Sequence, residues 1–435
     1  EISTRDWEFR RVLFRSWLAQ AGDWDRAAQR MAAQGQALLA AGGASTLERL
    51  LDLFPPEATQ RHPGLWFLRG LVAYQRFDFA GLVAAMEAAS AGFAAEGGEA
   101  LAWARLYAAV GCMNTGRLAQ ASADLAALRA EPHSAPVRAM VAYFTAWDAY
   151  ARHVPHDVAP AYLEHVEALE QVDDAATWEL AFFHSMLVGL PGTEAAIERF
   201  DRGAMRLTEG RASILRAGVL HARAARALDS GRLDEARAWI ARADDDVRWL
   251  GDPRALLTEH LMLHLFIDAA SGNADAWRSA AERLRADLAQ SAPSNQRTHT
   301  GSILHVIART AWTLHEDDAL RALAGEIVQV RNADEWPPAA TEQAIVQALV
   351  ALLEGREQAA EQALEDPPGI EDQCYGRASF ALLIRAEAQR RQGAIERAAR
   401  TLAPWLALAR EGRALSAPFI VGAQVMQALA AAGWA

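Results

Sequence analysis

The sequence predicts an all-α protein, an α-solenoid in which about ten helical hairpins of ~40 residues stack side by side into a right-handed superhelix. Three observations predict this fold. A glycine turn followed by a helix with small residues along one face recurs along the chain. Its copies follow one another at nearly regular spacing. Positions counted back from the turn glycines are apolar at one register and mostly polar at the next.

The clearest copy of the repeat is GRLDEARAWIARA, from Gly231 to Ala243. Gly231 permits the backbone conformation that ends a helix. In the helix that follows, Ala236, Ile240 and Ala243 are spaced by four and three residues, so they share one face. The two alanines allow a partner helix to approach closely, and the isoleucine fills the space between them.

Other turn glycines lead into the same pattern. Gly272 lies 41 residues after Gly231, and Gly393 lies 38 residues after Gly355. Between Gly272 and Gly355 there are two periods, with a turn that has no glycine near 315–318. The pattern resembles the second helix of a tetratricopeptide repeat, although the steps are longer than the ~34 residues of that family. The copies begin at Gly22, Gly116, Gly231, Gly272, Gly355 and Gly393.

Composition excludes several functions. The chain has 435 residues, a net charge of −12 and 43 basic residues, all of them arginine. Without lysine there can be no phosphate-binding loop of the GxxxxGK[ST] type. An acidic chain without a basic run after its first residues is not expected to touch nucleic acid. Two distant cysteines and no apolar run of ~18 residues predict a cytoplasmic protein with no membrane span.

The order of elements follows from the turn signals. Residues 1–16 resemble translated sequencing-adapter read-through, so we expect them to be non-native and assign 17–435 to the repeat domain. We expect helix pairs at 17–54, 99–130 and 136–170. Further breaks are expected at Gly42-Gly43, at Pro191-Gly192, in the loop-like stretch 291–302, and at the proline pairs Pro55-Pro56, Pro337-Pro338 and Pro367-Pro368.

One segment resembles a known family. The segment LFPPEATQRHPGLWFLRG, Leu53 to Gly70, followed by long helical hairpins, resembles the MalT-like repeat region of bacterial ATP-dependent transcriptional regulators of the LuxR and SARP types. The resemblance covers roughly 17–435 and implies a ligand-sensing or partner-binding arm without the ATPase and DNA-binding domains. Two alternatives stay open, a stand-alone protein-interaction scaffold and, remotely, a helical metal-dependent enzyme that uses His260 or His264.

Registers along the first helices suggest a binding surface. Residues seven positions before the turn glycines are small or apolar, so we expect that face to pack on the partner helix. Residues eight positions before are mostly polar and could line the concave groove, where tetratricopeptide arrays bind partners, or could form an outer solvated face. The groove hypothesis names Arg223, Arg226, His260, His264, Gln343, Gln347 and Arg385. The expected occupant is a protein or a small-molecule inducer, and self-association is left open.

Neither catalysis nor a cofactor is expected. His260 and His264 have the spacing of a two-histidine metal pair, but no third ligand and no HExxH motif accompany them, so we predict no metal. Asp244-Asp245-Asp246 is interpreted as a solvated run after a helix or as a cap. Aromatic residues near the first helices could line a site for a sugar, a peptide or a polyketide-like ligand, or could fill gaps between alanine-rich helices. They are Trp103, Tyr107, Trp147, Tyr150, Trp178 and Trp312.

Overall fold

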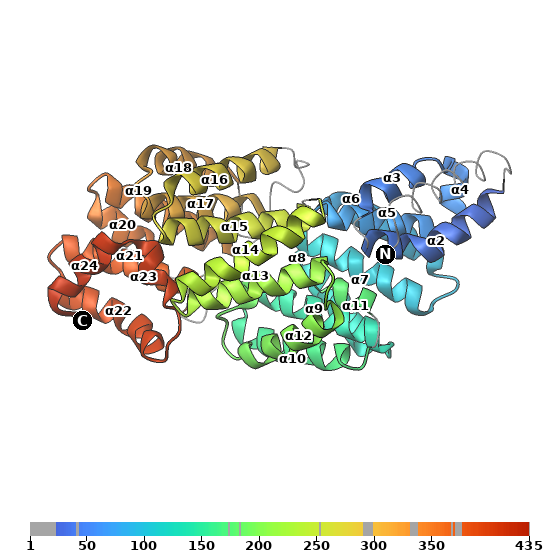
Figure 1. Ribbon diagram of the computed structural model, residues 1–435, viewed down its shortest axis with the longest axis horizontal. Coiled ribbons are helices and arrows are strands. Elements are labelled where there is room, and N and C mark those ends of the chain that lie inside the picture. The colour runs from blue at the N-terminus through green and yellow to red at the C-terminus, as the bar shows by residue number, and fades with distance from the viewer. Residues whose placement is uncertain are drawn as a thin grey trace.

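The structure, a computed structural model, describes residues 23–40, 43–172, 175–181, 184–251, 254–289, 299–330, 338–366, 369 and 376–434. Within these ranges every regular element is helical, and consecutive helices pack in antiparallel pairs along an elongated body (Figure 1). The predicted all-α stack of hairpins is therefore confirmed. The segment 1–16, Gly22 and the loop 291–298 lie outside the described residues. Of the described helices, none is long and apolar enough to cross a bilayer.

Eight hairpins are regular, and they stand in chain order along the stack. They are α5 (Pro63–Gln75) with α6 (Phe79–Phe93), α7 (Gly98–Asn114) with α8 (Leu118–Ala130), α9 (Ala135–Ala151) with α10 (Pro155–Leu169), α13 (Ile214–Asp229) with α14 (Leu233–Trp249), α15 (Arg254–Ala270) with α16 (Ala274–Ala289), α17 (His299–Thr313) with α18 (Asp317–Val330), α19 (Pro338–Leu353) with α20 (Glu357–Ala363), and α21 (Arg377–Arg391) with α22 (Ile395–Arg410).

Shorter helices flank these hairpins. Pro56 starts the short helix α4 instead of only ending its predecessor, and Pro63 stands at the first position of α5, where its missing N–H costs no helical hydrogen bond. The predicted loop 291–302 is corrected at its end, because residues 299–302 already belong to α17. The flanking elements are α2 (Trp24–Ala40), α3 (Ala44–Leu51) and α4 (Pro56–Arg61) at one end, and α23 (Ser416–Val421), α24 (Ala423–Leu429) and a π-helical turn (Ala430–Trp434) at the other.

The same backbone turn joins the two helices of each regular hairpin. In the α13–α14 turn, Gly231 has a φ of 71°, and the next N–H, of Arg232, donates to the carbonyl of Ala227 at 2.8 Å. This six-residue hydrogen bond satisfies a carbonyl that the helix end leaves free. The predicted turn glycines at 116, 272, 355 and 393 also have positive φ. The turns without glycine place Phe77, His153 and His315 in the left-handed region with the same hydrogen bond after them.

The second helices pack through the predicted small residues. Ala236 follows its turn glycine by five positions and is fully buried, as are Ala121, Ala360 and Ala398 at the same position. Trp277 takes that place in α16, where its indole N–H donates to the hydroxyl of Thr310 at 2.7 Å. The register seven residues before the glycines is buried at the five copies within the described residues, which confirms the expected packing face there: Ala109, Ala224, Leu265, Ala348 and Ala386 are all fully buried.

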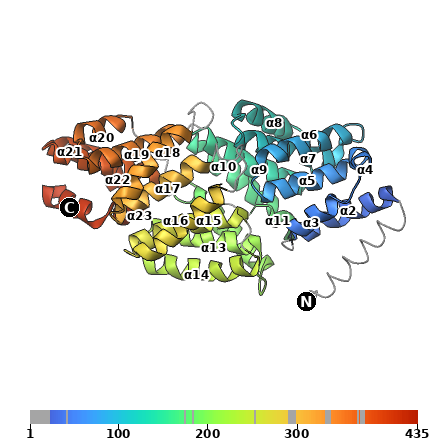
Figure 2. The same ribbon diagram turned by 90° about the horizontal axis from the view of Figure 1, so that it is seen from above.

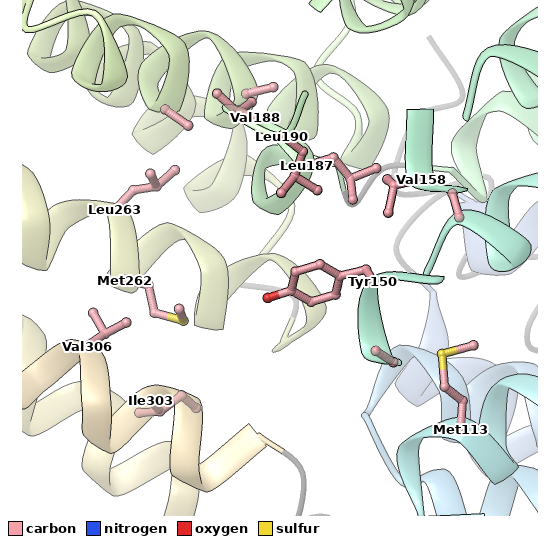
Figure 3. Close-up of a cluster of buried hydrophobic side chains, with 14 of the residues drawn as sticks. Met113, Tyr150, Val158, Leu187, Val188, Leu190, Met262, Leu263, Ile303 and Val306 are labelled. Atoms are coloured by element: carbon pink, nitrogen blue, oxygen red, sulfur yellow. The ribbon is translucent and has the colours of Figure 1, made fainter. Parts of the chain in front are cut away.

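One repeat is irregular. Between α10 and α13 the chain forms α11 (Ala175–Glu179), the 3-10 turn η1 (Ser185–Leu187) and α12 (Glu194–Leu207) in place of a continuous first helix. Gly192, with a φ of 79°, makes the predicted turn before α12. The core continues across the break, because Tyr150 of α9 projects toward Leu187 of η1 and Met262 of α15 (Figure 3).

The C-terminal segment folds back on earlier hairpins. Helix α23 contacts α13, α15 and α17 as well as its neighbour α21, and both views place it beside these hairpins (Figures 1 and 2). The Leu415 N–H donates to the carbonyl of Asp229 at 2.7 Å, and the indole N–H of Trp312 donates to the carbonyl of Val421 at 3.0 Å. The first helices of these middle hairpins are thus partly covered by the C-terminal segment of the chain itself.

The repeated turn generates a matched pair of substitutions. Gly272→Ala should lower the free energy of unfolding by about 1 kcal/mol, because a side chain disfavours positive φ even where space is open. His315→Gly, at the equivalent place in the next hairpin, should raise it by a few tenths to about 1 kcal/mol by releasing the same strain. Urea denaturation followed by circular dichroism measures both. A stabilising Gly272→Ala would contradict the turn geometry.

Candidate functional site

Three consecutive helices in the middle of the array, α13, α14 and α15, bring histidines and carboxylates together in one cluster. Helix α13 contributes His221, α14 contributes Asp244, and α15 contributes Glu259, His260 and His264. His221, Glu259 and His260 are buried, and Asp244 and His264 are half-buried. The interpretation of 244–246 as a solvated run or cap is corrected, because α14 continues to Trp249 and directs Asp244 toward α15.

The contacts form one continuous network. The Ser185 hydroxyl donates to Glu259, whose other oxygen lies 3.4 Å from Nδ1 of His221. Nε2 of His221 lies 3.1 Å from Nδ1 of His260. The Nε2 atoms of His260 and His264 lie 2.8 and 3.1 Å from the same oxygen, Oδ1 of Asp244.

Burial sets the protonation of this network. It lowers the pKa of His221 to about 3 and that of His260 to about 4, and it raises the pKa of Glu259 to about 8. Burial also acts to raise the pKa of Asp244, but hydrogen bonds from His260 and His264 outweigh it and leave that pKa well below its usual range. At neutral pH, Asp244 is therefore an anion that accepts N–H bonds from two imidazoles.

A second buried carboxylate holds the predicted arginines. Asp201 of α12 is 2 % exposed and accepts a hydrogen bond from Nη2 of Arg226 at 2.7 Å. Nε of Arg223 lies 3.5 Å from the same oxygen, and Nε2 of His184 lies 3.6 Å from the other. Arg223 also lies over the indole ring of Trp239, 4.9 Å from its centroid. Both arginines are thus engaged between neighbouring helices.

The remaining predicted residues lie farther along the stack. Gln343 donates to the carbonyl of Ile327 in α18 at 3.3 Å, and Gln347 is exposed. Although burial acts to raise the pKa of Glu361 in α20, hydrogen bonds and the charges of arginines that include Arg385 lower it. Gln343 and Arg385 therefore face the second helix of the preceding hairpin, whereas Gln347 faces solvent. That these seven residues bind a partner stays a prediction.

Sequence reasoning missed the partners that complete the network. Asp244, His221 and Asp268 carry no local motif, and Asp244 meets His264 only because α14 packs against α15. Two features could have signalled it: polar residues recur at one register, and acidic residues precede three of them by about half a repeat, with Asp201 before Arg223, Asp244 before His264 and Glu361 before Arg385. A histidine that faces a preceding helix needs a polar partner there.

A pocket of about 250 Å³ opens between the N-terminal hairpins and the irregular repeat. Its aromatic wall comes from α5 and α7, with Phe67, Tyr74, Trp103 and Tyr107, and its opposite wall includes Leu180 after α11 and Ile214 of α13. The rings of Trp103 and Tyr107 stack with centroids 6.1 Å apart, and Tyr74 meets Tyr107 edge-on at 5.3 Å. The polar residues Glu99 and Glu179 also line the pocket.

The other predicted aromatics mainly fill the core. Trp178 is fully buried beside Phe200, and Tyr150 is buried between hairpins. Trp147 packs edge-on against Tyr143 and Tyr150, and Trp312 is tied to Val421. Gap filling is therefore confirmed for these four, whereas Trp103 and Tyr107 line the pocket.

Comparisons with known proteins identify no family. No family model matches the chain, and no curated protein matches it. Among solved structures, the chain is similar to the crystal structure of the TPR domain of P58(IPK), at 15% sequence identity and a TM-score of 0.22, covering 84% of this chain and 98% of that one. A likeness at this level carries no argument about function.

The buried carboxylate of Asp201 gives a stability prediction. Arg226→Met should lower the free energy of unfolding by about 1–3 kcal/mol, because it leaves Asp201 buried without its closest cation. Arg248→Met, which removes an exposed pair with Asp245, should change it by no more than about 0.5 kcal/mol. Thermal melts of both variants test this. Equal effects would mean that Asp201 does not depend on Arg226.

Proposed function

We propose that this chain is a non-catalytic binding arm that senses a small, partly aromatic ligand in the pocket between α5, α7, α11 and α13. One observation carries the proposal. Aromatic side chains of the neighbouring helices α5 and α7 line one side of the pocket, and residues at α11 and α13, later in the chain, line the other side. Binding sites for small molecules are concave and largely apolar, with a few polar groups that fix orientation. The pocket has this composition.

Tyr107 supports a ligand in this pocket. Its side chain is 1 % exposed, and none of the described residues hydrogen-bonds its hydroxyl. Burial raises the pKa of Tyr107 well above its usual value, so the group stays a neutral hydroxyl. A buried hydroxyl without a partner costs free energy. A bound molecule with one hydrogen-bonding group would satisfy it once a small movement of the Tyr107 side chain opened the hydroxyl to the pocket.

The placement of the pocket suggests how binding would be sensed. Helix α11 contacts both α2 and α13, and Tyr74 and Phe77 pack on a small cluster that includes Ile214 and Val247. A ligand that contacts both walls would stabilise the arrangement in which these distant hairpins meet. Ligand binding would thus favour this shape of the superhelix over shapes in which these hairpins lie apart.

The family resemblance agrees with this role. The segment Leu53–Gly70 forms α4 and the first half of α5, and its Phe67 lines the pocket. In this proposal the array is the inducer-binding arm of a cytoplasmic ATP-dependent transcriptional regulator, and the switch and DNA-binding functions belong to other domains. A stand-alone protein-interaction scaffold remains the alternative, and in it Arg223, Gln347 and Arg385 would bind a protein.

The pocket can be probed with N-phenyl-1-naphthylamine, a neutral aromatic amine whose fluorescence rises in apolar sites. The wild-type chain should bind it at one saturable site, and Trp103→Ala should weaken binding at least ~10-fold, since it removes an aromatic wall. Trp249→Ala is the matched control, because Trp249 is 72% exposed on α14 and is not among the residues that line the pocket. Equal binding by all three proteins would contradict the proposal.

Tyr107→Phe separates a binding role from a packing role. Without ligand the variant should be as stable as the wild type or more stable by up to about 1 kcal/mol, because it removes an unsatisfied hydroxyl. It should bind the amine more weakly. A variant that is destabilised and still binds at wild-type strength would assign the hydroxyl to the fold.

A further inference from the structure

We propose that Asp244, His260 and His264 form a binding site for a divalent transition-metal ion of the zinc type. The site is separate from the aromatic pocket and does not depend on the function proposed for it. Sequence reasoning predicted no metal because the two histidines had no third ligand. The fold supplies that ligand from the preceding helix.

The three ligand atoms are already close together. One nitrogen of each histidine and one oxygen of Asp244 all lie within 4.8 Å of one another. Ligands around tetrahedral Zn²⁺ are roughly 3.4 Å apart, given bonds of about 2.0–2.1 Å. To reach this spacing, the two Nε2–Oδ1 distances, 2.8 and 3.1 Å, would open by a few tenths of an ångström, and the separation of the two histidine nitrogens, which is at most 4.8 Å, would close by no more than about 1.4 Å. Rotation of the side chains can bring about changes of this size.

The helices fix these side chains. His260 and His264 are four residues apart on α15, so they point to the same side, and their ring centroids are 4.7 Å apart. Asp244 extends from α14, which packs against α15. Ligands on packed helices change position little, so the site is largely formed before an ion arrives.

Each histidine also has a partner on its other nitrogen. Nδ1 of His260 lies 3.1 Å from Nε2 of His221, and Nδ1 of His264 lies 3.8 Å from a carboxylate oxygen of Asp268. A metal on Nε2 leaves the proton on Nδ1, from which His260 can donate to Nε2 of His221. The Asp268 carboxylate lies beside Nδ1 of His264 as an electrostatic partner, beyond hydrogen-bond distance. Such outer partners orient metal-binding histidines and select the tautomer that binds.

The site opens on one side. A cleft of about 420 Å³ borders it and is lined by Asp244, His264, Asp268 and Asn273 among others. Three protein ligands therefore leave a fourth position for water or an incoming ligand. Two imidazoles and one carboxylate suit zinc and its neighbours, because Mg²⁺ and Ca²⁺ prefer all-oxygen sites and Cu(I) prefers sulfur.

Competition between the full-length chain and a zinc-chelating dye, together with the visible spectrum after Co²⁺ addition, tests the site. The wild type should bind one equivalent of Zn²⁺ that excess Mg²⁺ or Ca²⁺ does not displace, and Co²⁺ should give the intense absorption of a tetrahedral complex. His264→Ala and Asp244→Asn should each weaken Zn²⁺ binding at least ~100-fold, and Asp268→Asn should weaken it about 10-fold.

The matched control is His156→Ala. His156 is an exposed histidine with a neighbouring aspartate, Nε2 to Oδ1 of Asp157 at 3.6 Å, but among the described residues it belongs to no group of three possible ligands. This variant should bind zinc like the wild type. Circular dichroism checks that every variant keeps its helices, and His264 is a suitable target because it is half-buried. Less than one equivalent of bound zinc, or equal affinity in the wild type, His264→Ala and Asp244→Asn, would overturn the proposal.

Discussion

The structure depends on one backbone constraint, the turn that ends each first helix with a residue at positive φ and a hydrogen bond back across six residues. The bond has nearly the same length at each regular turn, from 2.8 Å after Gly231 and Gly355 to 2.9 Å after Gly116, Gly272, Gly393 and His315. Because this turn fixes where the second helix starts, it also fixes which side chains face the first helix. The alanine at the fifth position after the turn residue can then be buried where the second helix comes closest to its partner helix.

The same constraint sets the polar chemistry. When every first helix has the same register relative to its turn, one row of its residues faces the second helix of the hairpin before it. Arg223, His264 and Gln343 belong to this side and reach Asp201, Asp244 and Ile327 on preceding helices. The histidines around Asp244 and the arginines around Asp201 therefore both lie at contacts between neighbouring repeats. A ligand or ion at such a contact would act on the angle between neighbours.

Much of the fold could be predicted from local signals, because a positive φ favours glycine and helix packing favours small residues at fixed spacing. The turn at Phe77 could not, since tertiary packing places this residue in a conformation that its side chain disfavours. The broken helix before α12 was also missed. Of the histidine site, the sequence indicated His260 and His264, but Asp244 depends on how two helices pack, which no spacing along one helix reveals.

The return of α23 onto α13, α15 and α17 changes how the array would respond to force. In an open solenoid each repeat touches only its neighbours, so a pulled chain peels away one repeat at a time. Here the bond from Leu415 to Asp229 and the bond from Trp312 to Val421 clamp the C-terminal segment onto the middle hairpins. Tension applied at the two ends would be carried by this clamp and would bypass the repeats between Asp229 and Leu415, which would bear load only after the clamp broke.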